Sequence, residues 1–175
     1  LTRPADMFII GLKIGFGIDR DRIFLKNVEL HLQESPMRLS RFHTMIDSMI
    51  QEVFFMNEVV TFLQANPVQY LATVGRDGRA KCRPFMFAGA LDGKLWFCTN
   101  TTKDVYRDMQ VNPYVELSVS SADYAWLRLS GEAVFSDSMA AKELCLQNPI
   151  VRSQYGDASN PIFTVFWLRD ARAVI

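Results

Sequence analysis

The pattern of apolar and polar residues becomes regular at Met56 and stays regular to the end of the chain. Residues 56–66 place apolar side chains three or four positions apart, which predicts an amphipathic helix that Pro67 ends. Two more helices are predicted, at residues 103–111 and 137–148. Runs with the composition of β-strands occupy residues 69–75, 79–91, 94–99, 114–120, 125–136 and 162–175.

The connections between these runs are short turns. Residues 75–78 (GRDG) and 92–93 (DG) predict hairpins, because Gly and Asp tolerate a positive φ angle. Gly131, inside a predicted strand, suggests a bulge or bend. Strands that follow one another through hairpins pair antiparallel, and here strands outnumber helices. We therefore predict a mainly β (α+β) fold, an antiparallel sheet closed into a small barrel.

Residues 1–55 lack this order and are expected to be an N-terminal extension, non-native or poorly structured. Their apolar run at residues 7–18 is too short to span a bilayer and has neither the charge nor the cleavage site of a signal peptide. Residues 40–55 could form a helix. Because the chain starts with Leu and ends inside a predicted strand, we expect Met56 to be the natural start and residues 56–175 to be a C-terminally truncated domain.

Composition narrows the classes of partner and chemistry. The 19 basic and 19 acidic residues include no basic run, which argues against nucleic acid or an anionic membrane as a partner. Cys82, Cys98 and Cys145 form no closely spaced pair, so we expect small buried thiols in a reducing cytoplasm rather than a zinc site. The two histidines, His31 and His43, precede the predicted domain, which therefore has no imidazole for a triad, a metal or a haem.

A cluster of polar residues lies where the strand at residues 94–99 meets the next helix. Residues 99–103 read TNTTK, and a helix N-terminus presents unpaired N–H groups with a partial positive charge. Hydroxyls, an amide and the Lys103 ammonium at such an end suit a phosphate. The same residue types are also good helix caps, so the segment by itself supports either interpretation.

Basic residues on the preceding strand favour the phosphate interpretation. Arg79, Lys81 and Arg83 alternate along the chain, so their side chains project from one strand face. The hairpin at residues 92–93 is expected to pair this strand with residues 94–99. Arg83 would then reach an anion that Lys103 holds.

Trp126 and Arg128 form a further candidate pair, two positions apart on one strand. One interpretation is a core Trp beside an Arg whose charged end reaches water. The other is an aromatic ring and a cation that face a planar, polar ligand. The strand pattern fits both.

Four motifs in this order, RPF, DGKLWFCTNTTK, NPYVEL and WLRLSGE, resemble the pyridoxamine 5′-phosphate oxidase-like family of FMN-binding proteins, and more narrowly its nitroimidazole-resistance branch. The resemblance covers about residues 56–175. It implies a six-stranded antiparallel split β-barrel with flanking helices, usually a homodimer with FMN at the subunit interface. It implies these cofactor-binding residues: Arg83, Pro84, Phe85, Cys98, Thr99, Asn100, Thr102, Lys103, Trp126 and Arg128.

We therefore expect an FMN-binding flavoprotein that acts as an oxidoreductase. It would pass electrons from a reduced nicotinamide or a small substrate to a small organic acceptor, such as a nitroaromatic compound. No side chain is identified as catalytic, and no metal is expected. Two alternatives stay open: a flavin-binding or stress-related module without turnover, and the same barrel with haem or a deazaflavin as its ligand.

Overall fold

The structure is a computed structural model that describes residues 15–19, 22–26 and 36–175. The chain divides into two compact units, Leu1–Ile46 and Asp47–Ile175. In the first unit, β1 (Gly15–Asp19) and β2 (Arg22–Lys26) form an antiparallel hairpin. Residues 7–14 of the predicted apolar run lie outside the described residues.

Helix α1 (Pro36–Ala65) runs through Met56 without a break. The two helical segments predicted on either side of Met56 are thus one helix, because no Gly or Pro interrupts it after Pro36. Its predicted apolar face is confirmed in the second unit, where Val59 and Leu63 lie in the core. No helix in the described part of the chain is long and apolar enough to cross a membrane.

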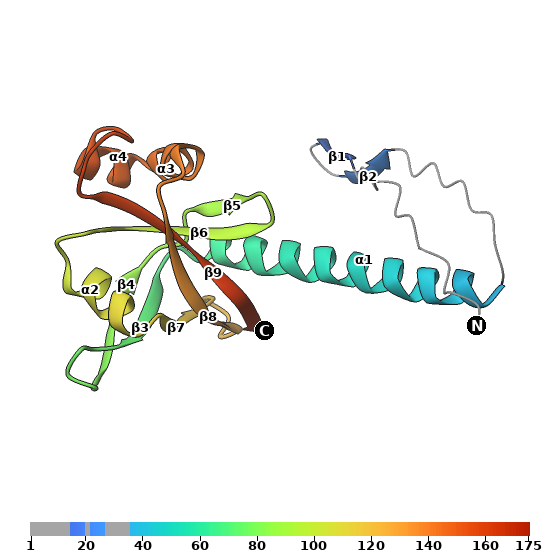
Figure 1. Ribbon diagram of the computed structural model, residues 1–175, viewed down its shortest axis with the longest axis horizontal. Helices are drawn as coiled ribbons and strands as arrows, with labels where there is room; N and C mark the ends of the chain where they lie inside the picture. Colours follow the sequence, from blue (N-terminus) through green and yellow to red (C-terminus); the bar gives the residue numbers. More distant parts are fainter. Residues whose placement is uncertain (1–14, 20–21, 27–35) are drawn as a thin grey trace, which may run out of the picture. The chain divides into compact units, whose positions relative to one another are not determined.

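Seven antiparallel strands form one sheet in the second unit (Figure 1), in the order β4-β3-β7-β8-β9-β6-β5. Their bounds are β3 (Gln69–Val74), β4 (Ala80–Phe85), β5 (Gly89–Leu91), β6 (Lys94–Asn100), β7 (Tyr114–Ser120), β8 (Trp126–Ser136) and β9 (Phe163–Val174). The α+β class and the antiparallel pairing are as predicted. The bulge expected at Gly131 is also confirmed, because the register between β8 and β9 shifts there.

The predicted count of six strands is wrong, because residues 79–91 form two strands instead of one. These strands, β4 and β5, are the two edges of the sheet, yet only residues 86–88 join them. Four residue steps span at most about 14 Å, so the sheet curves until its edges approach each other. Gly89 adopts a φ angle of 155° where β5 begins, a conformation that residues other than glycine rarely adopt.

A buried glutamine supports the link between the two edges. Gln69 is 1% exposed, and its side-chain oxygen accepts the Phe87 N–H at 2.8 Å. Its side-chain nitrogen donates to the Leu63 carbonyl at 2.9 Å, which joins the link to the end of α1. The Ala88 N–H donates to the Trp96 carbonyl at 3.0 Å. The polar groups of this crossing are therefore satisfied inside an apolar core.

Two apolar clusters flank the region where the candidate site lies. The larger one fills the curve of the sheet, where the Phe97 and Phe166 rings stack at 5.4 Å between centroids. The second packs α3 (Met139–Leu146) and α4 (Pro149–Tyr155) against β6 and β9 (Figure 1). Ser138 caps α3, which lies within the helix predicted at residues 137–148, whereas α4 was not predicted. The third helix of this unit, α2 (Asp104–Val111), follows β6.

Candidate functional site

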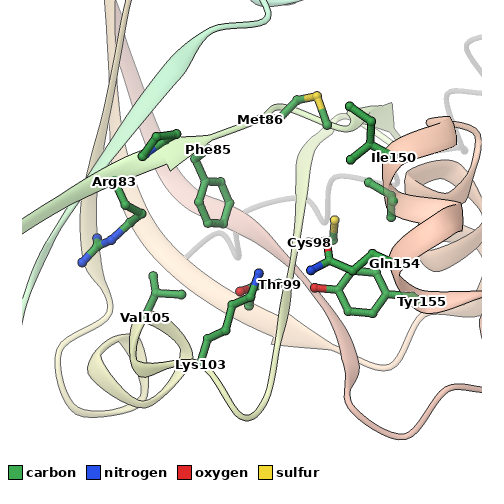
Figure 2. A pocket seen from close by; sticks show the side chains of 12 residues that line it. Arg83, Phe85, Met86, Cys98, Thr99, Lys103, Val105, Ile150, Gln154 and Tyr155 are labelled. Carbon is green, nitrogen blue, oxygen red and sulfur yellow. The ribbon is translucent and has the colours of Figure 1, made fainter.

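A cavity of about 330 Å³ opens between β4, β6, the start of α2 and α4 (Figure 2). Of the ten cofactor-binding residues expected from the sequence, six line it: Arg83, Pro84, Phe85, Cys98, Thr99 and Lys103. Asn100 and Thr102 lie beside the cavity but do not line it, and Trp126 and Arg128 lie elsewhere on the sheet. The role of all ten in holding a cofactor stays a prediction.

The polar corner divides into a turn and a set of groups that face the cavity. The Asn100 side-chain oxygen accepts hydrogen bonds from the Thr102 N–H and the Thr102 hydroxyl, both at 2.7 Å. These two residues therefore satisfy each other in a local Asx turn. Lys103 is the N-cap residue of α2, and no side chain caps this helix end by a hydrogen bond. Helix capping by the threonines does not account for the corner.

Thr99 is the residue of the site whose side chain most clearly lacks a hydrogen-bond partner among the described residues. Its side chain lines the cavity, the residue is 2% exposed, and its hydroxyl has no hydrogen-bond partner among the described residues. A buried hydroxyl without a partner costs about 1–3 kcal/mol. Such a group is expected where a ligand supplies the missing hydrogen bond.

The two predicted cations reach the cavity in different ways. Figure 2 shows the Lys103 side chain directed into the cavity, toward Thr99. Among the described residues, the Lys103 ammonium has no hydrogen bond or ion pair. The Arg83 guanidinium turns away and donates to the Leu71 carbonyl at 3.1 Å and to the Thr73 hydroxyl at 2.7 Å. Lys103 is therefore the freer of the two charges.

The predicted pairing that was to bring Arg83 close to Lys103 is wrong. β4 pairs with β3, where Arg83 lies opposite Leu71, while β6 pairs with β5 and β9. Both residues still line one cavity because the curved sheet brings its edges together. The other two basic residues of the predicted row do not line it: Arg79 precedes β4, and the Lys81 ammonium pairs with Asp77 at 2.8 Å.

Helix α4 supplies a wall of the cavity that sequence reasoning missed. Tyr155 and Gln154 line it, and Figure 2 shows the Tyr155 hydroxyl and the Gln154 amide directed toward Lys103. Burial, with a smaller contribution from Cys98, raises the pKa of Tyr155 to about 12, so its hydroxyl keeps its proton at neutral pH and can donate a hydrogen bond. The sequence signal that could have predicted this helix is Asn148 at the N-cap, followed by Pro149 at the first helical position.

Cys98 lines the same cavity and has an unusual thiol environment. The neighbouring Cys145 thiol lowers the pKa of Cys98, and the Lys103 charge lowers it further, against the opposite effect of burial. The Cys98 sulfur and burial raise the pKa of Cys145. The expectation that all three cysteines are buried is wrong for Cys82, which is exposed on the edge strand β4.

Trp126 and Arg128 lie on β8, on an open face of the sheet. The Arg128 guanidinium carbon lies 5.3 Å from the centroid of the Trp126 ring. Trp126 is 47% exposed, so it is not a core residue. Arg128 lies opposite Ser118, Ser118 opposite Tyr70, and Tyr70 opposite Pro84 at the cavity. Three strand spacings separate Arg128 from Pro84, roughly 14 Å. Within one chain, Trp126 and Arg128 are therefore not part of the cavity.

Comparison with known proteins bears on this geometry. A sequence model described as pyridoxamine 5′-phosphate oxidase matches residues 55–172. A pyridoxine/pyridoxamine 5′-phosphate oxidase from Chromobacterium violaceum is 30% identical over 95 residues, which are 54% of this chain and 45% of that protein. The match thus spans less than half the length of this curated relative.

Two solved structures are similar to the chain in fold. A NimC/NimA family protein from Clostridium acetobutylicum has a TM-score of 0.62 at 30% identity, over 67% of this chain and 82% of that chain. A pyridoxamine 5′-phosphate oxidase-related, FMN binding protein from Nostoc punctiforme has a TM-score of 0.53 at 20% identity, over 72% of this chain and 81% of that chain. The second likeness is one of fold alone.

Proposed function

The chain belongs to the pyridoxamine 5′-phosphate oxidase family, and we propose that it binds FMN in the cavity between β4, β6 and α4 and acts as an FMN-dependent oxidoreductase. The observation that carries the proposal is the buried Thr99 hydroxyl, which faces the cavity without a partner in the described chain, close to the unpaired Lys103 ammonium. A phosphate satisfies both groups at once.

The phosphate end of FMN fits the donors that line the cavity. Lys103 supplies a full positive charge, and the N–H groups at the start of α2 add a partial one. The Thr99 hydroxyl donates from a fixed, buried position, and the Tyr155 hydroxyl stays protonated because of its raised pKa. The side chain of Arg83 completes the wall while β3 holds its guanidinium.

The ring end of FMN requires an apolar wall that excludes water. Phe85, Met86 and Ile150 line the cavity and supply part of this wall. A volume of about 330 Å³ is at the low end of the range for ligand sites, about 300–1,000 Å³, so one chain covers only part of a flavin. When bound, FMN supplies the hydride and electron transfer that the side chains cannot perform.

We propose that a second copy of the chain completes the site and that the curved sheet closes into a split barrel. Trp126 and Arg128 would then reach the flavin from the partner, which accounts for their exposure on the open face of the sheet. Tyr70 on the same face is 47% exposed. Sizing of the full chain with and without FMN tests this, and a monomer at every concentration would contradict it.

The proposed reaction passes electrons from a reduced nicotinamide to a small organic acceptor. The resemblance of the sequence motifs to the nitroimidazole-resistance branch supports a nitroaromatic acceptor. The described lining contains no carboxylate and no imidazole, so protons would come from water. That lack of an acid–base pair also supports the alternative of a flavin-binding module without turnover.

The absorption spectrum distinguishes these possibilities. Purified protein supplied with FMN should show flavin bands, which NADH or NADPH should bleach and an acceptor should restore. Bands that no nicotinamide bleaches would favour the module without turnover. A Soret band would instead indicate haem, and a protein that ignores added FMN would reject the proposed cofactor.

A further inference from the structure

Arg83 lines the cavity with its side chain, but its charged end bonds to the neighbouring strand. It lies on β4 opposite Leu71 of β3. One nitrogen, Nη1, donates both to the Thr73 hydroxyl at 2.7 Å and to the Leu71 carbonyl at 3.1 Å. Thr73 is 4% exposed and Leu71 1%, so the acceptors that hold the guanidinium belong to buried residues of β3.

A second attraction acts on the guanidinium in this position. Against the effect of burial, Arg76 and more weakly Arg83 lower the pKa of Asp108, so the Arg83 charge also acts on that carboxylate. Figure 2 shows the guanidinium directed away from Lys103. The two cations of the cavity therefore face different groups, since Lys103 faces the cavity and Arg83 faces β3.

The Arg83 guanidinium has a choice between two kinds of partner. An arginine side chain turns about several single bonds, so its charged end can exchange partners while β4 stays in place. Thr73 and Leu71 offer neutral acceptors to one nitrogen, whereas a phosphate offers two parallel hydrogen bonds and an opposite charge. An anion beside Lys103 is the stronger partner, but the bonds to β3 must break before Arg83 reaches it.

We propose that Thr73 is a positioning residue that competes with a bound phosphate for Arg83, an inference that rests on the proposed function. The Thr73 hydroxyl holds the guanidinium on β3, and breaking this bond reduces the net free energy of anion binding. Thr73 thereby lowers the affinity of the site through Arg83, although it does not itself line the cavity.

The test is a titration of the full chain with FMN, followed by flavin fluorescence, for wild type, Thr73→Val and Thr73→Ser. Valine matches the shape of threonine without its hydroxyl, so Thr73→Val should bind FMN about 3–10-fold more tightly, as expected for one net hydrogen bond. Serine keeps the hydroxyl, so Thr73→Ser should bind like wild type. If Thr73 had a merely structural role, its loss would weaken binding or leave it unchanged.

Two controls connect the gain in affinity to Arg83 and to the phosphate. In an Arg83→Ala background, Thr73→Val should leave the affinity for FMN unchanged, because no guanidinium remains to be released. Riboflavin lacks the phosphate, so wild type and Thr73→Val should bind it equally.

Three results would overturn the proposal. They are an FMN affinity in Thr73→Val that is equal to or below that of wild type, a gain that persists without Arg83, and an equal gain for riboflavin. If Thr73→Val does not fold, Arg83→Ala alone decides the matter. It should weaken FMN binding if Arg83 leaves β3 for the phosphate, and unchanged binding would show that Arg83 stays on β3.

Orthophosphate separates this proposal from the proposed function. Phosphate should raise the melting temperature of Thr73→Val by more than that of wild type, through the same release of Arg83. If wild type ignores FMN but this difference in phosphate is seen, the FMN site is rejected and the competition for Arg83 stands. If wild type binds FMN and Thr73→Val shows no gain, the competition is rejected and the FMN site stands. No FMN binding and no difference in phosphate would reject both.

Discussion

The Asp108 carboxylate on α2 accepts two hydrogen bonds from Arg76, one from its backbone N–H and one from its side-chain Nε, both at 3.1 Å. Asp108 is buried, with its side chain 6% exposed, and Arg76 lies in the turn between β3 and β4. This pair fixes α2, and with it the Lys103 corner, to the strand that carries Arg83. The cavity thus depends on an ion pair outside its own lining.

Asp108→Ala should lower the free energy of unfolding by about 2 kcal/mol, because it removes charge-assisted hydrogen bonds from a buried site. Asp104→Ala is the matched control: Asp104 contacts the same Arg76 at 2.7 Å, but its side chain is 76% exposed. Exposed pairs contribute less than about 1 kcal/mol, so the control should cost little. Urea unfolding measures both, and equal losses would contradict the structural role of Asp108.

The Asp108 pair also predicts how stability depends on pH. Burial would raise the pKa of Asp108, but the hydrogen bonds and charge of Arg76 outweigh it and hold this pKa below its usual value. A carboxyl with a lowered folded pKa stabilises the protein above its unfolded pKa of about 3.9, and the contribution is lost as pH falls through the folded value.

The advantage of wild type over Asp108→Asn in unfolding free energy should therefore be constant from pH 7 to about pH 5 and should shrink below about pH 4. Urea titrations across this range measure it. An advantage that stays unchanged in acid would show that the Asp108 charge contributes nothing.

Gln69→Ala should destabilise the chain by about 3 kcal/mol, because it leaves the Phe87 N–H unpaired in the core and opens a cavity. Gln110→Ala on the exposed side of α2 is the control and should change stability by less than about 0.5 kcal/mol. Thermal unfolding followed by circular dichroism compares them. If the two variants were equally stable, Gln69 would not hold the link between the sheet edges.

Thr99→Val and Thr73→Val should have opposite effects on the ligand-free protein. The first removes a buried hydroxyl that has no described partner, so it should stabilise the chain by about 1 kcal/mol. The second removes the hydroxyl that accepts from Arg83 at 2.7 Å, so it should destabilise the chain by about 1–2 kcal/mol. Melting temperatures without FMN test both signs. A stability loss in Thr99→Val would mean that its hydroxyl is already satisfied.

Local chemistry explains why much of the fold could be predicted. The turn at residues 92–93 needs positive φ angles, and Asp92 and Gly93 have them, at 52° and 69°. Gly131 marks a bulge for the same kind of local reason, since a Cβ there would lie 3.0 Å from the Arg169 carbonyl. The apolar face of α1 near Val59 follows from helical spacing alone.

The parts that could not be predicted depend on contacts between distant residues. Residues 79–91 look like one strand, and only the curvature of the whole sheet breaks them into β4 and β5. The place of Tyr155 in the cavity wall depends on how α4 packs against Phe163. The centroids of the Tyr155 and Phe163 rings are 4.5 Å apart. Sequence reasoning could bring Thr99, Lys103 and Arg83 together only through the family resemblance and a pairing that the structure corrects.

The central claim is that the Lys103 corner holds the phosphate of FMN. The most direct test is a titration of the ligand-free full chain with FMN, followed by flavin fluorescence, for wild type, Lys103→Ala and the control Lys142→Ala on α3. The account predicts saturable binding in wild type and Lys142→Ala, and a loss of about 1–3 kcal/mol, or roughly 5–150-fold in affinity, in Lys103→Ala. Equal affinity for all three proteins, or no binding by wild type, would contradict it.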